Sequence, residues 1–188
     1  MLPFSDRVNM DLTSRRAVLR ATAAGVVVGL AGCSGNGGDG DGDGDDNGGA
    51  TPVPGSTYPA IDEWLTETDI GGSADNYDGT LVNRTGQDTL TVDVGAEGNG
   101  GAFAFGPAAV VVSTGTEVEF SWTGEGGLHN VEALPEEQLG ESDYEFSSGE
   151  PVDTTGVEYT RTLDETGIVL YHCEPHLSLG MKGAIAVR

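Results

Sequence analysis

The sequence predicts an all-β protein, a two-sheet β-sandwich or barrel of about eight strands with a short helix before the first of them. Eight short runs rich in valine, threonine and aromatic residues occur between residues 79 and 188. Glycine-rich turns separate these runs, and they do not alternate with long helical patterns, which argues against a parallel α/β sheet. The length of 188 residues suits one domain with appendages better than several domains.

The first 32 residues have the composition of an export signal. Arg15 and Arg16 form a pair that resembles the twin-arginine motif, and an eleven-residue apolar stretch, 21–31, follows them. That stretch is too short for a bilayer core of about 30 Å, which needs roughly 20 helical residues. We therefore expect residues 1–32 to be a twin-arginine signal peptide that directs the protein out of the cytoplasm.

The signal ends in Leu30-Ala31-Gly32-Cys33, which resembles a lipobox in which the cysteine receives a lipid. The alternatives for Cys33 are a free thiol or a disulfide with Cys173, the only other cysteine. Residues 33–57 are rich in glycine and aspartate and have no apolar periodicity, so we expect a flexible tether. Together these features predict a lipid-anchored protein on the extracytoplasmic face of the cell membrane.

The folded domain is predicted over residues 58–188. Pro59 precedes Ile61, Trp64 and Leu65, which share one helical face, so a helix is expected over 59–67. Strands are expected in the runs 79–84, 88–94, 101–113, 116–122, 128–133, 157–163, 167–173 and 183–188. The longest irregular stretch, roughly 133–151, carries six acidic residues and is expected to be a solvated crossing loop.

The chain is strongly acidic, with 31 acidic and 8 basic side chains and a formal net charge of −23. Nucleic-acid binding is excluded because neutralising phosphates requires a basic face. Self-repulsion of this size destabilises a compact state unless counterions are abundant, which favours a halophilic protein. Intrinsic disorder is the alternative for such a composition, but the repeated apolar runs argue against it.

Four potential metal donors have a recognisable spacing. His129 follows a glycine-rich turn, and a Cys-x2-His-x4-Met segment follows it with Cys173, His176 and Met181. A thiolate and a thioether favour Cu(I) and imidazoles accept Cu(II), so this set suits a copper ion that changes oxidation state. Zinc also binds Cys and His but would leave the thioether unexplained. Alternatively, a single histidine or methionine can be structural.

These residues, the twin-arginine and lipobox signal, and the segments TGEGGLHNV and YHCEPHLSLGMKGAIAV resemble the cupredoxins, in particular the haloarchaeal relatives of plastocyanin. The resemblance implies a cupredoxin-like Greek-key sandwich or barrel with one type 1 copper ion, held by His129, Cys173, His176 and Met181. It also implies that Asn130 ties the two ligand loops together and supports the thiolate. Plastocyanins commonly have Tyr where this chain has His172, which alternates away from Cys173 and is expected not to be a ligand.

The resemblance implies an electron carrier and not an enzyme. Such a protein would be a monomer that exchanges single electrons with membrane-bound donors and acceptors of the oxidase or reductase type. Only three histidines are present, too few for the further copper clusters of a multicopper enzyme. The alternative function is an extracytoplasmic copper-storage or copper-delivery protein. Pro175, Leu177 and Leu179 are expected to form an apolar docking patch beside His176, unless both leucines pack inward.

Overall fold

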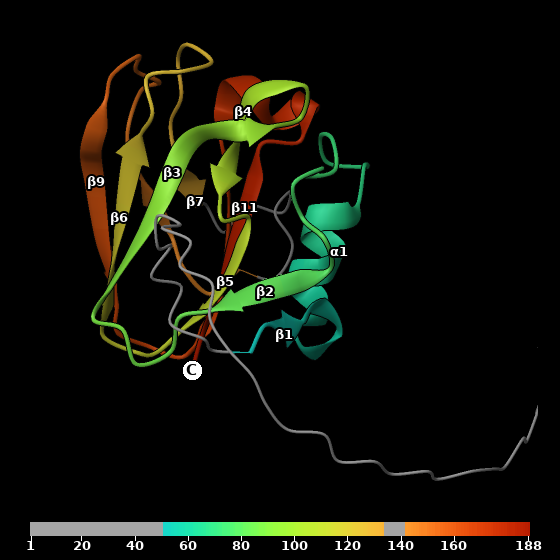
Figure 1. Cartoon of the computed structure of the whole chain (residues 1–188), viewed down its shortest axis with the longest axis vertical. Coiled ribbons are helices and arrows are strands. Elements are labelled where there is room, and N and C mark those ends of the chain that lie inside the picture. Colours follow the sequence, from blue (N-terminus) through green and yellow to red (C-terminus); the bar gives the residue numbers. More distant parts are fainter. Residues whose placement is uncertain (1–50, 134–141) are drawn as a thin grey trace, which may run out of the picture. The chain divides into compact units, whose positions relative to one another are not determined.

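The computed structural model describes residues 51–133 and 142–188. The predicted signal peptide, Cys33 and most of the predicted tether lie outside these ranges. Within the described ranges, no helix is long and apolar enough to cross a membrane. Figure 1 shows two layers of strands, with helix α1 (Pro59–Thr66) beside the strands β2 and β11.

The strands form two sheets, which confirms the predicted all-β fold, and neither sheet closes into a barrel. Eight of the eleven strands in the described ranges have four or more residues. In spatial order, the larger sheet contains β1 (Val53–Pro54), β2 (Thr80–Asn83), β5 (Ala109–Val112), β11 (Lys182–Val187), β10 (Gly167–His172), β7 (Glu132–Ala133) and β8 (Phe146–Ser147). The smaller sheet contains β4 (Gly101–Gly106), β3 (Thr89–Gly98), β6 (Thr116–Trp122) and β9 (Gly156–Leu163).

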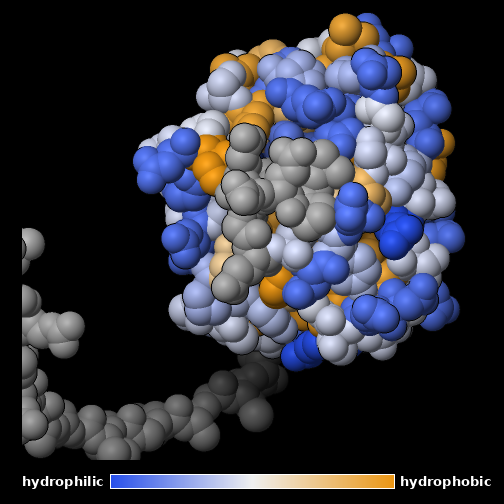
Figure 2. Space-filling model, turned by 180° about the vertical axis from the view of Figure 1, so that it is seen from behind, coloured by the Kyte–Doolittle hydropathy of each residue, from blue (hydrophilic) through white to orange (hydrophobic). Residues whose placement is uncertain are grey.

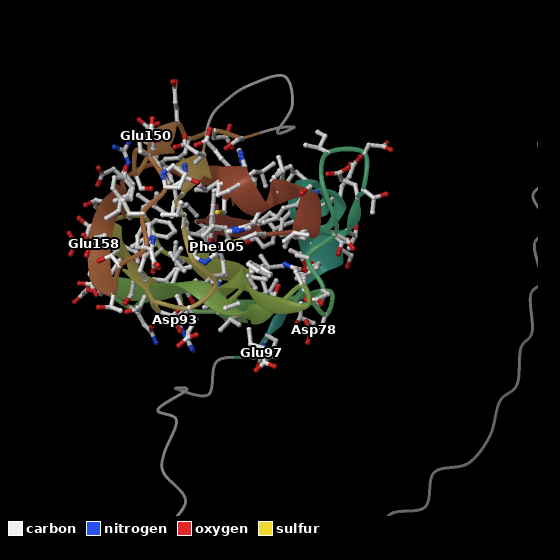
Figure 3. All side chains as sticks on the ribbon, turned by 90° about the horizontal axis from the view of Figure 1, so that it is seen from above. Asp78, Asp93, Glu97, Phe105, Glu150 and Glu158 are labelled. Atoms are coloured by element: carbon white, nitrogen blue, oxygen red, sulfur yellow. The ribbon has the colours of Figure 1, made fainter. Side chains whose placement is uncertain are left out.

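The main core lies between the two sheets. Strands β3 and β6 pair in parallel and send alternate side chains inward, as their sequence alternation predicts; the inward pairs are Leu90 with Val118, Val92 with Phe120, and Val94 with Trp122. Figure 3 shows Phe105 in the interior, while the labelled acidic side chains point away from the domain. The two sheets therefore enclose an apolar core, and the labelled acidic residues lie at the surface of the domain.

Helix α1 confirms the helix predicted over 59–67, ending one residue earlier. Its buried side chains Ile61, Trp64 and Leu65 lie on the larger sheet, and the Trp64 indole N–H donates to the Gly183 carbonyl at 3.1 Å. The helix forms a second apolar cluster against the outer side of β5, β10 and β11. Because both faces of this sheet are covered, every residue of β5 and β11 is buried, and these strands have continuous rather than alternating burial.

The run 101–113, predicted as one strand, is two strands in different sheets. β4 pairs with β3, whereas β5 lies between β2 and β11 in the other sheet. Pro107, which has no N–H to donate to a ladder, lies in the segment between them. The chain therefore crosses from one sheet to the other within this run.

The boundaries of the predicted tether and of the predicted acidic loop also differ in the structure. β1 begins at Val53 and pairs with β2, so the sheet includes residues assigned to the tether. The stretch 133–151 is not wholly solvated, because Tyr144 and Phe146 are buried in the main core and β8 pairs with β7. Tyr144 and Phe146 pack into the core although acidic residues precede and follow them, because burial of their aromatic rings is favourable.

Candidate metal centre

Three of the predicted ligands converge at one end of the sandwich. The Cys173 Sγ lies 3.6 Å from the His129 Nδ1 and 3.5 Å from the His176 Nδ1, and the two Nδ1 atoms are 3.1 Å apart. A point equidistant from all three atoms lies about 2.0 Å from each, which is the length of a metal–imidazole bond. The three donors are therefore spaced to share one ion.

His129 is held by hydrogen bonds of its backbone and of its ring Nε2, the nitrogen that does not face Cys173. Its N–H and C=O form a bridge with Val152, and the Trp122 indole N–H donates to its carbonyl at 3.1 Å. The ring Nε2 lies 2.9 Å from the Glu125 carbonyl, which can only accept, so Nε2 carries the proton. The lone pair of Nδ1 then points at the site, a tautomer fixed by the protein.

The other donors come from the connection between β10 and β11. Cys173 follows β10, a 3-10 helix (Glu174–Leu179) carries His176, and Gly180 turns the chain with a φ of 98°. The Cys173 N–H donates to the Met181 carbonyl, and the Met181 N–H donates to the His176 carbonyl. The backbone thereby closes this ligand loop (173–181) at its neck, with Met181 buried beside Cys173 in the main core.

Asn130 joins the two segments that carry the donors. Its side chain accepts from the Glu174 N–H at 2.9 Å and donates to the Glu174 carboxylate at 2.7 Å. The side chain itself is fully buried. The contact between the two ligand loops expected for Asn130 is therefore present, across a sequence separation of 44 residues.

The electrostatics of the site suit a cation. Burial raises the pKa of the Cys173 thiol to about 11, although backbone hydrogen bonds from Asn130 and His176 oppose this rise. Burial lowers the pKa of His129 and of His176, and the neighbouring His129 lowers the pKa of His176 further. At neutral pH the imidazoles are therefore uncharged donors, and a bound metal ion would release the thiol proton. The two Nδ1 atoms are 3.1 Å apart, so a proton or a metal ion can lie between them.

Phe103 is a site residue that the sequence did not indicate. Its ring lies on the His176 ring, with centroids 4.7 Å apart and planes at 39°. Phe103 belongs to β4 of the opposite sheet, 73 positions before His176. No local sequence signal identifies such a contact, because only the packing of the two sheets brings the rings together.

The remaining predicted residues lie around this group. His172 is not in the donor cluster; its ring meets the edge of Trp64 at a centroid distance of 6.5 Å. Pro175 and Leu179 are exposed, as expected for a docking patch. Leu177 is half-buried against the apolar cluster under helix α1, so the alternative of inward packing holds for Leu177 and not for Leu179. Leu128, beside His129, is 56% exposed and is a third exposed apolar residue of the segments that carry the ligands.

Comparisons with known proteins agree with this geometry. A family model described as copper binding proteins of the plastocyanin/azurin family matches residues 91–188. The chain is 45% identical over 177 residues to a halocyanin of Natronomonas pharaonis, covering 94% of this chain and 98% of that one. It is 34% identical over 101 residues to a plastocyanin of Scenedesmus fuscus, covering 53% of this chain and 99% of the relative.

The comparisons confirm the resemblance to the cupredoxins and confirm copper as the cofactor. The donor set fits that ion, because a thiolate, two imidazoles and a thioether are the soft and borderline ligands that copper accepts. The thioether of Met181 lies on the same loop as Cys173 and His176. The protein is a blue copper electron carrier and not an enzyme. By its sequence and the family it matches, this chain belongs to the plastocyanin/azurin family of copper binding proteins.

Proposed function

We propose that this protein is a membrane-anchored type 1 copper carrier that passes single electrons between membrane redox complexes outside the cytoplasm. One observation supports the electron-transfer site most strongly: a buried thiol and two imidazoles converge within 3.1–3.6 Å on two loops held by the sheets. Bound copper would supply a one-electron couple. The proposed ligands are His129, Cys173, His176 and Met181.

The chain's own residues would keep the site nearly unchanged between the two oxidation states. His129 is fixed by Val152, Trp122 and Glu125, while the ligand loop is closed at its neck by backbone hydrogen bonds. Cys173 and Met181 have no exposed surface, and His129 is only 1% exposed. A rigid donor set with three buried members changes little when charge is added or removed, which favours fast electron transfer.

We propose that electrons enter or leave beside His176. His176 is the most exposed of the proposed ligands. Pro175 precedes it directly, Leu179 follows it by three residues, and Leu128 directly precedes His129. We call these three residues the apolar rim. A transient partner can approach closely over such a rim, because little charge has to be desolvated. The partners would be membrane-bound donors and acceptors, and the carrier would act as a monomer.

Leu179→Asp tests this surface. We expect the substitution to slow electron exchange with membranes of the source organism by roughly five- to tenfold, the effect of about 1 kcal/mol of lost contact free energy. The copper spectrum should not change, because the side chain is 45% exposed. Stopped-flow recording of the blue absorption after mixing with reduced membranes measures the rate.

Thr162→Asp is the matched control. It adds the same charge at an exposed position of β9 that pairs with Glu117. Glu117 lies five residues, or about 17 Å, along β6 from Trp122, whose indole binds the His129 carbonyl. The rate of the control should equal that of the parent. If Leu179→Asp exchanges electrons as fast as the parent does, the apolar rim is not the docking surface.

The proposed anchor at Cys33 is tested by Cys33→Ser. Loss of the lipid should transfer the protein from washed membranes to the soluble fraction, because the proposed lipid supplies the hydrophobic contact with the bilayer. A single acyl chain binds membranes only marginally, so we expect a two-chain lipid in the parent. Immunoblots of the two fractions measure the change, with Cys173→Ala as the cysteine control. If the Ser variant sediments with membranes as fully as the parent, Cys33 is not the anchor.

The acidic surface leads us to propose a high-salt environment. Figure 2 shows one face on which hydrophilic residues predominate and hydrophobic ones are scattered. The formal net charge is −23, so removal of salt should strengthen repulsion in the folded state. We expect the melting temperature to fall by roughly 10 °C between molar KCl and dilute buffer, about 2–3 kcal/mol for a domain of this size.

Charge removal provides the control for the salt experiment. Glu117 and Glu119 project from β6 on the outer side of the smaller sheet. Replacing both by Gln makes the net charge less negative by two units and should reduce the slope of melting temperature against salt. A melting temperature of the parent that does not change with KCl would contradict the halophilic interpretation.

A further inference from the structure

Helix α1 contacts the start of β11, and the segment after the helix contacts the ligand loop, although both lie outside the matched family region of 91–188. We define residues 59–76 as the brace. Its buried helix face rests on the larger sheet, and its last residues run along the ligand loop. The brace thus lies outside the residues that the family model matches, and it contacts residues on the ligand loop and directly after it.

Lys182 makes the first contact between the brace and the site. It is the only lysine of the chain, follows Met181 directly and has no exposed side-chain surface. Its ammonium group binds the Glu67 carboxylate at 2.5 Å and donates to the carbonyls of Trp64 and Glu67 at 3.2 Å. It also lies 4.5 Å from the centre of the Trp64 ring. Burial of a lone charge is costly, so this complete set of partners fixes the side chain.

The backbone of the brace makes the second contact. The Gly72 N–H donates to the Leu177 carbonyl at 3.0 Å. The approach is so close that a Cβ on Gly72 would lie 2.8 Å from the Gly180 nitrogen, and one on Gly180 would lie 2.1 Å from the Ser73 carbonyl oxygen. Two glycines therefore allow the brace and the ligand loop to touch along their backbones.

The third contact reaches His176 indirectly. Asp75 and Asn99 exchange two hydrogen bonds, in which each side chain accepts from the other residue's N–H. The Asn99 amide also donates to the Phe103 carbonyl at 2.6 Å, and the Phe103 ring lies on His176. The brace is thereby connected to both sides of the ligand loop, at His176 and at the residue after Met181.

We propose that the brace holds the ligand loop in place and that Lys182 is the positioning residue that fixes Met181 relative to Cys173 and the two histidines. Lys182 does not touch the metal. Its side chain anchors the first residue of β11 to the end of helix α1, and Met181 immediately precedes that residue. This proposal rests on the proposed function, because it assumes that Met181 is the axial ligand.

Lys182→Met in the copper-loaded protein is the direct test. Methionine has an unbranched side chain one atom shorter than that of lysine, and it cannot donate to Glu67 or the helix carbonyls. We expect a changed ratio of the visible absorption bands, a shifted reduction potential and at least roughly tenfold faster hydrogen exchange at the Gly180 and Met181 amides. Arg161→Met is the matched control. Arg161 is an exposed residue of β9 whose guanidinium group lies over the Phe146 ring, so the substitution removes one positive charge away from the brace. It should leave all three quantities at the parent values.

Gly72→Ala is the second variant and does not change the charge. Its added methyl group should push the Gly180 backbone away and shift the spectrum and potential of the copper site. Glu67→Gln, which keeps an acceptor for Lys182, should have a smaller effect than Lys182→Met. If Lys182→Met does not fold, Gly72→Ala decides the question.

The outcomes separate this proposal from the proposed function. A copper-loaded parent without thiolate-to-copper absorption would overturn the proposed function. If the parent is blue, and both Lys182→Met and Gly72→Ala have its spectrum, potential and amide exchange rates, the brace does not position the ligand loop. The proposed electron-carrier function would be unaffected by that result.

Discussion

Cys173→Ala should abolish the intense visible absorption of the copper-loaded protein and reduce its affinity for Cu(I). The absorption arises from the bond between copper and thiolate, and Cys173 provides the one thiol of the donor cluster. The remaining imidazoles bind Cu(II) but provide no soft charged ligand for Cu(I). Absorption spectra with stoichiometric copper, and titration with a Cu(I) chelator as competitor, measure the two losses.

Cys33→Ser serves as the matched control for this prediction, because it removes the other cysteine and should keep the full colour. The folded state should persist in Cys173→Ala, since the backbone bonds that close the ligand loop do not use the thiol. An unchanged visible spectrum in Cys173→Ala would exclude a copper–thiolate centre at this position.

Met181→Gln should retain copper but lower its reduction potential, which is the second large effect we expect. An amide oxygen is a harder donor than a thioether and stabilises Cu(II) relative to Cu(I). Without copper the amide would be buried and unpaired, because Met181 has no exposed surface, and the apoprotein should lose about 1–3 kcal/mol of stability. Spectroelectrochemistry and thermal melts with and without copper measure these changes.

Met181→Leu provides the comparison. It offers no donor atom but keeps an apolar side chain of similar volume, so it should shift the potential upward with little effect on the apoprotein. Opposite shifts in the two variants would identify Met181 as the axial ligand. Potentials equal to the parent in both variants would remove Met181 from the ligand set.

The site also explains why the donors remain ready for a metal ion. Without an ion the Cys173 thiol holds its proton at neutral pH because burial raises its pKa to about 11. The His129 tautomer is already set by the Glu125 carbonyl. Little has to move when an ion enters, and the thiol exchanges its proton for the metal.

The local patterns of the sequence determined a large part of the protein. Alternation over 89–94 and 117–122 predicted which faces of β3 and β6 are buried, since alternate side chains of a strand point to opposite faces. The spacing of Ile61, Trp64 and Leu65 predicted helix α1. The Cys-x2-His-x4-Met segment placed its donors in one short loop, because so few residues cannot separate widely.

Only the tertiary structure decided how these pieces meet. The run 101–113 has an uninterrupted apolar pattern, and the division into β4 and β5 depends on their partners in two different sheets. Leu177 is half-buried because helix α1 lies beside it, and Phe103 meets His176 across the sandwich. The partly buried ion pair of Lys182 with Glu67 spans 115 positions. Contacts of such separation depend on packing and solvent exclusion, which a local pattern of residues does not contain.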